Sequence, residues 1–250
     1  MSSQPPPPVT DAVDPAVVER LVVPDEPSIT FPGFTKEAFS ILERLRARPH
    51  IEQYQADKPA IRAHLKRPFT SYRDDLVVNA VLPNGLRLET ERNVFSRLLK
   101  NDFGAGGCHH HMWMSFYRPA RTRLTDLQLA HSIRPSGFRI AVIARRAALQ
   151  TFTHALDAHQ DRSARVLDVI NGQLAEAEGG FYIRSRAGEQ TDFTEPIDVM
   201  PEDFASAASF GLYRFIPSRD VVRLGGGLLR EALLSMKQLW PYYNLLLASD

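Results

Sequence analysis

Residues 127–144 read L-Q-L-A-H-S-I-R-P-S-G-F-R-I-A-V-I-A, and this stretch decides the fold. Two apolar runs flank a Pro-Ser-Gly sequence at 135–137, whose residue types favour a tight turn. In the second run Phe138, Ile140 and Val142 alternate with Arg139, Ala141 and Ile143, which is the period of a β-strand. The segment therefore predicts a β-hairpin, and with it an antiparallel sheet.

The flanking sequence adds further strands and helices to this hairpin. Short runs with strand character occur at 86–90, 108–117, 181–186 and 212–216. Helical spacing occurs at 35–48, 51–67, 69–82, 147–159, 162–177 and 228–247, with a break or restart at Pro68, a short helix at 201–208 and a bend near Pro241. Residues 191–199 read as a loop, and Gly225-Gly226-Gly227 as a flexible joint. We expect an α+β fold with helices packed on an antiparallel sheet.

The same reading gives the domain organisation. Residues 1–27 are rich in Pro, Ser and Asp and predict a disordered tail, within which 17–23 would form a short docked piece. Residues 28–250 predict a single α+β domain. Its parts are a helical subregion at 35–82, a sheet-forming region at 86–145, and helices with the remaining strands at 146–250.

Charge is unevenly distributed along a chain of ordinary composition. The 250 residues are 44% hydrophobic and 24% charged, with a formal net charge of +1. Residues 87–146, however, contain eleven Arg or Lys and four Asp or Glu, a net charge of +7, which leaves −6 for the rest. This asymmetry favours one basic face and an anionic partner. The alternative is that long Arg side chains only cover strand surface.

Cysteine content and the absence of apolar runs bear on the compartment. Cys108 is the single cysteine, so no internal disulfide forms and a reducing compartment fits. The start, M-S-S-Q-P-P-P-P, lacks the basic and apolar regions of a secretory signal. No apolar run reaches the ~18 residues that a bilayer requires. We expect a cytoplasmic protein without a membrane-spanning segment.

Residues 91–118 combine charged, glycine and histidine residues between apolar runs. Arg and Lys suit phosphate groups, Asp102 would orient either cation, and aromatic faces suit stacked bases. The glycines at 104, 106 and 107 do not form a P-loop, because no Gly-Lys-Ser/Thr follows. The predicted ligand-binding residues are Arg97, Lys100, Asp102, Arg118, Trp113 and Tyr117. The alternative is an internal salt-bridge network with core aromatic residues.

The run Cys108-His109-His110-His111 contains residue types that bind transition metals. Neighbours on a strand point to opposite faces, so Cys108 pairs only with His110, and His109 only with His111. Two ligands are too few without a further one from elsewhere, such as His131. These four residues are the metal candidates, but we predict no metal site, no cofactor and no catalytic residue. The usual enzyme motifs are also missing from the sequence.

Two segments carry a resemblance to a known family. They are F-S-R-L-L-K-N-D-F-G at 95–104, with Gly107 and residues 113–117, and Phe34-Thr35 with Ala38, Phe39, Leu42 and Leu45. They resemble an uncharacterised bacterial domain of unknown function, the number twenty-four sixty-one type. In a close subgroup this domain stands at the N-terminus of McrB-type AAA+ restriction ATPases. The resemblance covers about residues 30 to 250, including W-P-Y-Y-N-L-L-L-A-S-D at 240–250.

The resemblance implies a targeting or sensing module of a system that recognises foreign or modified DNA. It implies an AAA+ ATPase partner, on a separate chain, or a domain that acts alone. It also makes Arg97, Lys100 and Asp102 a ligand-facing set. The triple histidine departs from the pattern of that family.

Three functional hypotheses follow. The first is a non-catalytic binding module of an McrB-like restriction or defence system, whose basic sheet face binds nucleic acid or another phosphate-bearing ligand. The second is an enzyme that acts on a phosphorylated substrate, with or without a metal at the histidines. The third is a protein-interaction domain that docks through its final helix.

Overall fold

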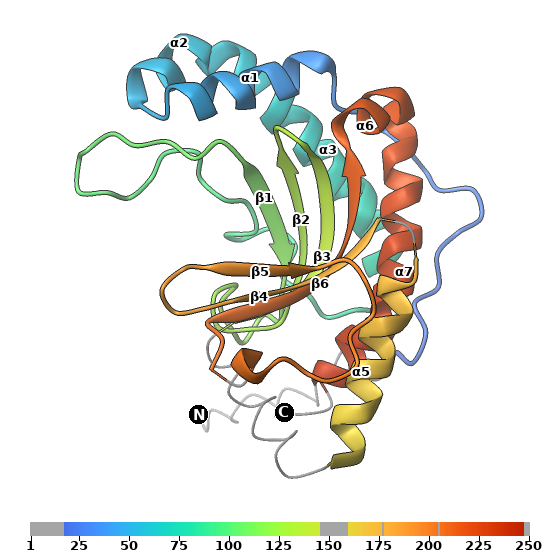
Figure 1. Ribbon diagram of the computed structural model, residues 1–250. Coiled ribbons are helices and arrows are strands. Elements are labelled where there is room, and N and C mark those ends of the chain that lie inside the picture. The colour runs from blue at the N-terminus through green and yellow to red at the C-terminus, as the bar shows by residue number, and fades with distance from the viewer. Residues whose placement is uncertain (1–17, 146–159, 177, 205, 248–250) are drawn as a thin grey trace, which may run out of the picture.

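The structure is a computed structural model that describes residues 18–145, 160–176, 178–204 and 206–247. The described residues contain a six-stranded antiparallel sheet with the order β1-β2-β3-β6-β4-β5 (Figure 1). Its strands are β1 (Met112–Phe116), β2 (Gln128–Arg134), β3 (Gly137–Arg145), β4 (Gly179–Arg184), β5 (Gln190–Phe193) and β6 (Ser209–Pro217). The chain has an α+β fold, as its sequence predicts.

The predicted hairpin is confirmed as β2 and β3, with Gln128 opposite Ile143 and Arg134 opposite Gly137. The turn glycine also lies against β6. A Cβ atom at Gly137 would be 2.2 Å from the carbonyl oxygen of Ile216, so a larger residue would push the strands apart. Glycine at this position therefore lets β6 pair along the whole length of β3.

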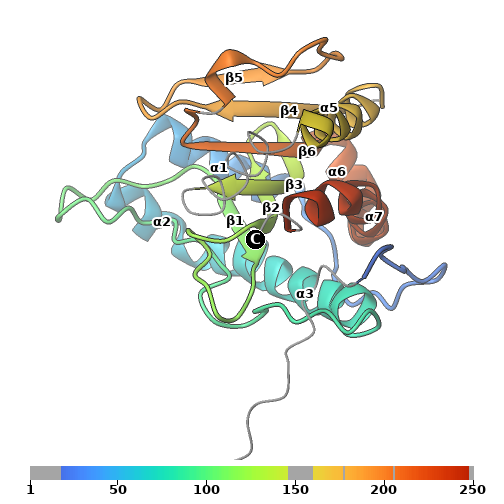
Figure 2. The ribbon, with the colours of Figure 1, turned by 90° about the horizontal axis from the view of Figure 1, so that it is seen from below.

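The described helices are α1 (Lys36–Ala47), α2 (Ile51–Ile61), α3 (Arg67–Leu76), α5 (Gln160–Leu174), α6 (Ser218–Leu224) and α7 (Leu228–Leu247). Helices α5, α6 and α7 lie together along one side of the sheet, and α3 contacts α7 (Figures 1 and 2). None of the described helices has both the length and the apolar character that crossing a bilayer requires.

The two faces of the sheet differ in what covers them. One face supplies Phe138, Val142 and Leu212 to the main hydrophobic core, together with residues of α3 and α7. The second face has a separate small cluster, which no described helix residue joins. Its members are Ala130, Ala141, Ile143, Tyr182 and Tyr213, with Phe215 packed against them. In Figure 1, β4 and β5 run across the direction of β1, β2 and β3, so the sheet is strongly twisted.

The predicted break or restart at Pro68 is a restart, because α3 begins at Arg67 and the helical region continues. Residues 51–81 form one continuous helical run, because π-helical segments at Arg62–Lys66 and Val77–Val81 follow α2 and α3. In the first segment the amide of Arg67 donates to the carbonyl of Arg62, five residues back. This wider turn places Pro68 at the start of α3, where its missing N–H leaves no helical hydrogen bond unmade.

Some strand boundaries need correction. β1 begins at Met112, not 108, and residues 86–90 form only an isolated bridge, between Glu89 and Tyr117. An alternating pattern makes a strand only where a partner strand continues beside it, and Tyr117 lies beyond the end of β1. The predicted loop at 191–199 begins with β5, which pairs with β4 at the edge of the sheet. Edge strands expose both charged and polar residues, so β5 lacks an apolar signal.

Helix predictions in the C-terminal half also differ from the structure. The short helix predicted at 201–208 is a 3-10 turn, Glu202–Phe204, and α6 was not predicted. Gly225–Gly227 is a 3-10 turn that joins α6 to α7. The predicted helix at 147–159 lies outside the described residues.

Residues 18–27, which the sequence assigns to the tail, make defined contacts. The indole N–H of Trp240 on α7 donates to the carbonyl of Val18 at 2.6 Å. The amide of Val22 donates to Oδ1 of Asn84 at 2.8 Å, and Nδ2 of Asn84 donates back to the carbonyl of Val22 at 2.7 Å. Leu21 is buried. Residues 18–23 therefore pack as a docked piece, and residue 17 of the predicted piece lies outside the described residues.

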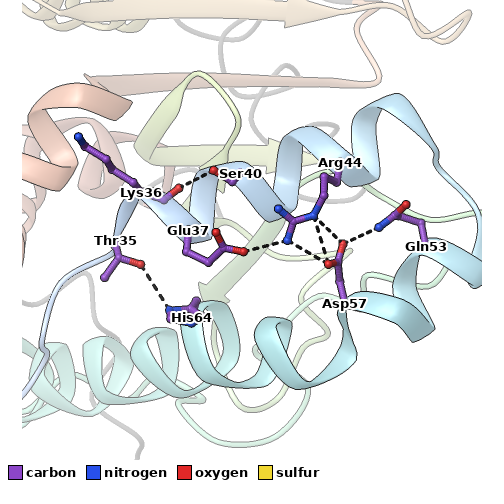
Figure 3. Close-up of polar contacts among 8 residues, drawn as sticks. All are labelled: Thr35, Lys36, Glu37, Ser40, Arg44, Gln53, Asp57 and His64. Carbon is purple, nitrogen blue, oxygen red and sulfur yellow. Dashed lines mark hydrogen bonds and ion pairs between the residues drawn. The ribbon is translucent and has the colours of Figure 1, made fainter.

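Arg44 fastens α1 to α2 (Figure 3). Its guanidinium donates at 2.9 Å to Oδ1 of Asp57 on α2 and at 2.9 Å to Oε1 of Glu37 on α1. The hydrogen bonds to Asp57 and Glu37 raise the pKa of Arg44 above its usual value. Asp57 also accepts a hydrogen bond of 2.8 Å from Gln53. This network holds α1 in place, and α1 carries Arg46 to the rim of the second face of the sheet.

Candidate anion-binding site

A cavity of about 410 Å³ lies on the second face of the sheet. Four arginines of the sheet line it: Arg134 from β2, Arg139 and Arg145 from β3, and Arg184 from β4, and Arg46 of α1 is a fifth lining arginine. We call this cavity the arginine pocket. Its other lining residues are His110, His111, Trp113, Gln128, Ala130, Ser132, Pro135, Ser136, Ala141, Ile143, Tyr182 and Gln190. Because β1 to β5 all contribute, this face curves around the cavity, whose volume is typical of a small-molecule site.

Strand pairing sets the floor of the arginine pocket. Trp113 on β1 lies opposite Ser132 on β2, and Ser132 lies opposite Arg139 on β3. The next row places Ala130 opposite Ala141. Since alternate residues of a strand share a face, Arg139, Ala141 and Arg145 all face the pocket. The small side chains between the arginines leave open the space that the cavity occupies.

Two tyrosines lie flat on this face because glycines stand opposite them. Tyr213 on β6 pairs with Gly180 on β4, and Tyr182 on β4 pairs with Gly211 on β6. A Cβ atom at Gly180 would be 2.2 Å from the ring of Tyr213, and one at Gly211 would be 2.7 Å from the ring of Tyr182. The glycines therefore make room for the two rings across the neighbouring backbone.

The arginines rest on aromatic rings. The guanidinium carbon of Arg139 is 3.9 Å from the ring centroid of Tyr213 and 5.7 Å from that of Tyr182. The guanidinium carbon of Arg145 is 5.7 Å from the ring centroid of Trp113, and that of Arg123 is 4.7 Å from the same ring. Cation–π contact orients a guanidinium and leaves its charge unneutralised. The rings thus orient these guanidinium groups without supplying a counter-charge.

Among the described residues, no carboxylate lines the arginine pocket itself. Arg134 and Arg139 also line a neighbouring cavity, together with Glu178 and Asp192. Arg184 donates to Oε1 of Gln190, a neutral amide, at 2.6 Å. The Nε atoms of Arg134, Arg139 and Arg145 are shielded from solvent and have no hydrogen-bond partner. Buried polar groups are normally paired, so these three atoms carry an energetic cost in the fold.

The electrostatics of Arg134 agree with this description. Burial lowers its pKa from the usual 12.5 to about 10, with a further lowering from Arg139 and Arg184 and partial compensation from Tyr182 and Asp192. Asp192 is already engaged, since it accepts hydrogen bonds from the hydroxyl of Tyr213 at 3.2 Å and from Gln190 at 2.6 Å. An anion in the pocket would reverse the shift by supplying the opposite charge.

The histidines lie at the edge of the arginine pocket. Burial, followed by the charge of Arg134, lowers the pKa of His111 to about 4, so its imidazole is neutral at pH 7. The ring centroids of His109 and His111 are 5.3 Å apart, and those of His110 and His111 are 5.7 Å apart. In the described parts of the chain, no group of three or more His, Cys, Asp or Glu side chains is placed to hold a metal ion.

Of the six predicted ligand-binding residues, Trp113 lines the arginine pocket and the others do not. Arg97 and Lys100 are exposed. Arg97 lies near enough to Arg123 to contribute to the lowered pKa of that guanidinium, whose main cause is burial. Arg97 therefore adds positive charge near Arg123, whose guanidinium lies over the ring of Trp113.

Asp102, Arg118 and Tyr117 have partners of their own. The carboxylate of Asp102 accepts hydrogen bonds from the amides of Gly106 at 3.1 Å and Gly107 at 2.6 Å, which close the glycine loop. Arg118 donates to the buried Asp126, with Nε 2.9 Å from Oδ1. The hydroxyl of Tyr117 donates to the carbonyl of Arg92 at 2.7 Å. These contacts stabilise the local fold, and the ligand-binding role of the three residues stays a prediction.

The pocket arginines themselves were not singled out in the sequence. Arg134, Arg139 and Arg145 belong to the basic segment at 87–146, and two of them interrupt or end the apolar second arm of the hairpin at positions that share a face. The even spacing of Arg139 and Arg145 along one predicted strand could therefore have indicated a basic face. Arg184 comes from β4, and only the strand order β3-β6-β4 brings it near the others.

A scan of the chain against models of protein families gives no match, and neither does a search of curated proteins. The resemblance noted in the sequence, with the restriction system and the ATPase partner that it implies, therefore stays a prediction.

Proposed function

We propose that this chain is a binding module that takes a phosphate-bearing ligand in the arginine pocket. The observation that carries the proposal is the grouping of Arg134, Arg139, Arg145 and Arg184 around one cavity whose lining contains no described Asp or Glu. Phosphate oxygens are the acceptors that arginine forks fit best, because two N–H groups bond two oxygens in parallel.

The surroundings of the pocket favour binding over proton-transfer chemistry. None of the described lining residues is Asp or Glu, the usual partners in general acid–base catalysis. Arg139 and Arg145 lie over aromatic rings, which orient a guanidinium without neutralising its charge. Such a site is suited to recognising an anion. The same chemistry would serve the nucleic-acid reading of the sequence, in which phosphates are the groups contacted.

Isothermal titration calorimetry with inorganic pyrophosphate tests the proposal. We expect saturable binding that weakens as NaCl is raised from about 50 to about 200 mM, because salt screens the interaction of the charges. The double variant Arg139→Gln/Arg145→Gln should lose the binding. Arg230→Gln removes an exposed arginine of α7 and should leave it unchanged. Absence of pyrophosphate binding to the wild type, or equal binding by the double variant, would refute the proposal.

A further inference from the structure

Arg139 and Arg145 of the pocket lie at two separate places on the sheet. Arg139 and Arg145 both belong to β3, six residues apart on one face. At about 3.3 Å per residue their Cα atoms are roughly 20 Å apart. Arg139 leans over Tyr213 on β6, whereas Arg145 leans over Trp113 on β1. The two side chains therefore turn to opposite sides of their own strand.

The aromatic supports fix how far apart the charges are held. Strands β2 and β3 separate β1 from β6, so Trp113 and Tyr213 stand three strand spacings apart. At about 4.8 Å per spacing this is roughly 14 Å across the sheet. The guanidinium carbons stay within 5.7 Å and 3.9 Å of the respective ring centroids. A single phosphate group is too small to bond both guanidinium groups in these positions.

Each end has additional positive charge. Arg134 and Arg139 act on each other electrostatically at the end near Tyr213, and Arg123 and Arg145 do so at the end near Trp113. Arg184 shares the row of Arg145, because both pair with Ser209 on β6. Between the ends the floor consists of the small residues Ala130, Ser132 and Ala141. An uncharged organic group can lie over this floor while a phosphate at each of its ends contacts an arginine.

We propose that the ligand of the arginine pocket is a small molecule with two phosphate groups, one for each end, joined by an uncharged organic part. This inference rests on the proposed function and adds the number and spacing of the anionic groups. A continuous nucleic-acid strand is a different ligand, because it would also place a charge at each step over the neutral floor.

Calorimetry with matched synthetic probes separates these possibilities. The probes are alkanediol bisphosphates of increasing chain length, from propane to decane, and the corresponding alkyl monophosphates. We expect one bisphosphate to bind per chain, at least about tenfold tighter than the monophosphate at the best chain length, because the second contact becomes intramolecular. Two monophosphates should bind per chain. This comparison uses the wild-type protein and does not depend on any variant folding.

Single variants assign the two ends. Arg139→Gln and Arg145→Gln should each reduce the bisphosphate affinity to that of the monophosphate and leave one monophosphate site, while Arg230→Gln changes neither. Equal affinity of bisphosphates and monophosphates at every chain length would overturn the two-ended ligand but leave phosphate binding intact. Binding of none of the probes would count against the proposed function itself. Tighter binding of a single-stranded pentanucleotide than of the best bisphosphate would also overturn the inference, in favour of a strand.

Discussion

Replacing Arg134 with methionine should stabilise the ligand-free protein. A pKa of about 10 in place of the usual 12.5 corresponds to roughly 3 kcal/mol of unfavourable free energy for the charged form, at about 1.4 kcal/mol per pH unit. Because the folded-state pKa lies below the unfolded one, this penalty is present in full at neutral pH and fades only above about pH 10. Methionine keeps much of the apolar stem and removes the charge.

The net gain should be smaller than the full penalty, since some packing is lost. We expect the free energy of unfolding to rise by about 1–3 kcal/mol, in line with replacements of buried charges by apolar residues. At about 2–4 °C per kcal/mol for a chain of this size, the melting temperature should rise by several degrees. Urea denaturation and thermal melts, followed by circular dichroism without phosphate, measure both quantities. The exposed Arg230→Met is the matched control and should change stability by less than about 0.5 kcal/mol.

The same melts repeated with pyrophosphate test whether Arg134 contributes to binding. Pyrophosphate should raise the melting temperature of the wild type more than that of Arg134→Met, because a ligand stabilises the state that binds it. If Arg134→Met instead lowers the free energy of unfolding by more than about 1 kcal/mol while Arg230→Met is neutral, then favourable contacts hold Arg134. In that case the picture of uncompensated charge in the pocket is wrong.

Three further predictions follow from the contacts described above. Gly180→Ala should destabilise the fold by about 1–3 kcal/mol and weaken pyrophosphate binding, because the new Cβ would be 2.2 Å from the ring of Tyr213; a variant with unchanged stability in urea would refute this. Asp126→Asn should cost about 3–5 kcal/mol, because it removes the charge of a fully buried carboxylate that accepts hydrogen bonds from Arg118, and an effect below 1 kcal/mol would show the pair to be dispensable. His111 has a pKa of about 4 in the folded chain, so the unfolded chain takes up its proton first as the pH falls from about 6.5 to 4. His111→Gln should flatten the loss of stability over that pH window in denaturant titrations, and an unchanged slope would contradict the assigned environment.

The fold was largely accessible from the sequence where side-chain period and turn chemistry agreed. The hairpin around Pro135-Ser136-Gly137 is confirmed, because two apolar runs, the alternation of the second arm and a turn sequence point to the same element. β5 was missed because an edge strand needs no apolar face. The restart at Pro68 was predictable from its ring, whereas the π segment before it was not, because no local pattern indicates such a segment.

The candidate site was harder to predict from the sequence than the fold, because its residues come together only in the folded sheet. The segment at 91–118 attracted attention through composition, yet Asp102 and Arg118 are occupied by local hydrogen bonds. The pocket instead collects residues from five strands, and its arginines are ordinary in sequence. Only the cross-strand register shows that Arg139 and Trp113 lie in one row and that Arg184 belongs to the same face.

The pairs formed by Tyr213 with Gly180 and by Tyr182 with Gly211 have a consequence for how a ligand would arrive. Rings that lie flat on strand backbone have little freedom to reorient, so the guanidinium of Arg139 already has its binding orientation when the pocket is empty. A receptor of this kind loses little conformational entropy on binding. The association rate should then be limited mainly by diffusional encounter and electrostatic attraction. Differences in affinity among ligands should arise mainly from their dissociation rates.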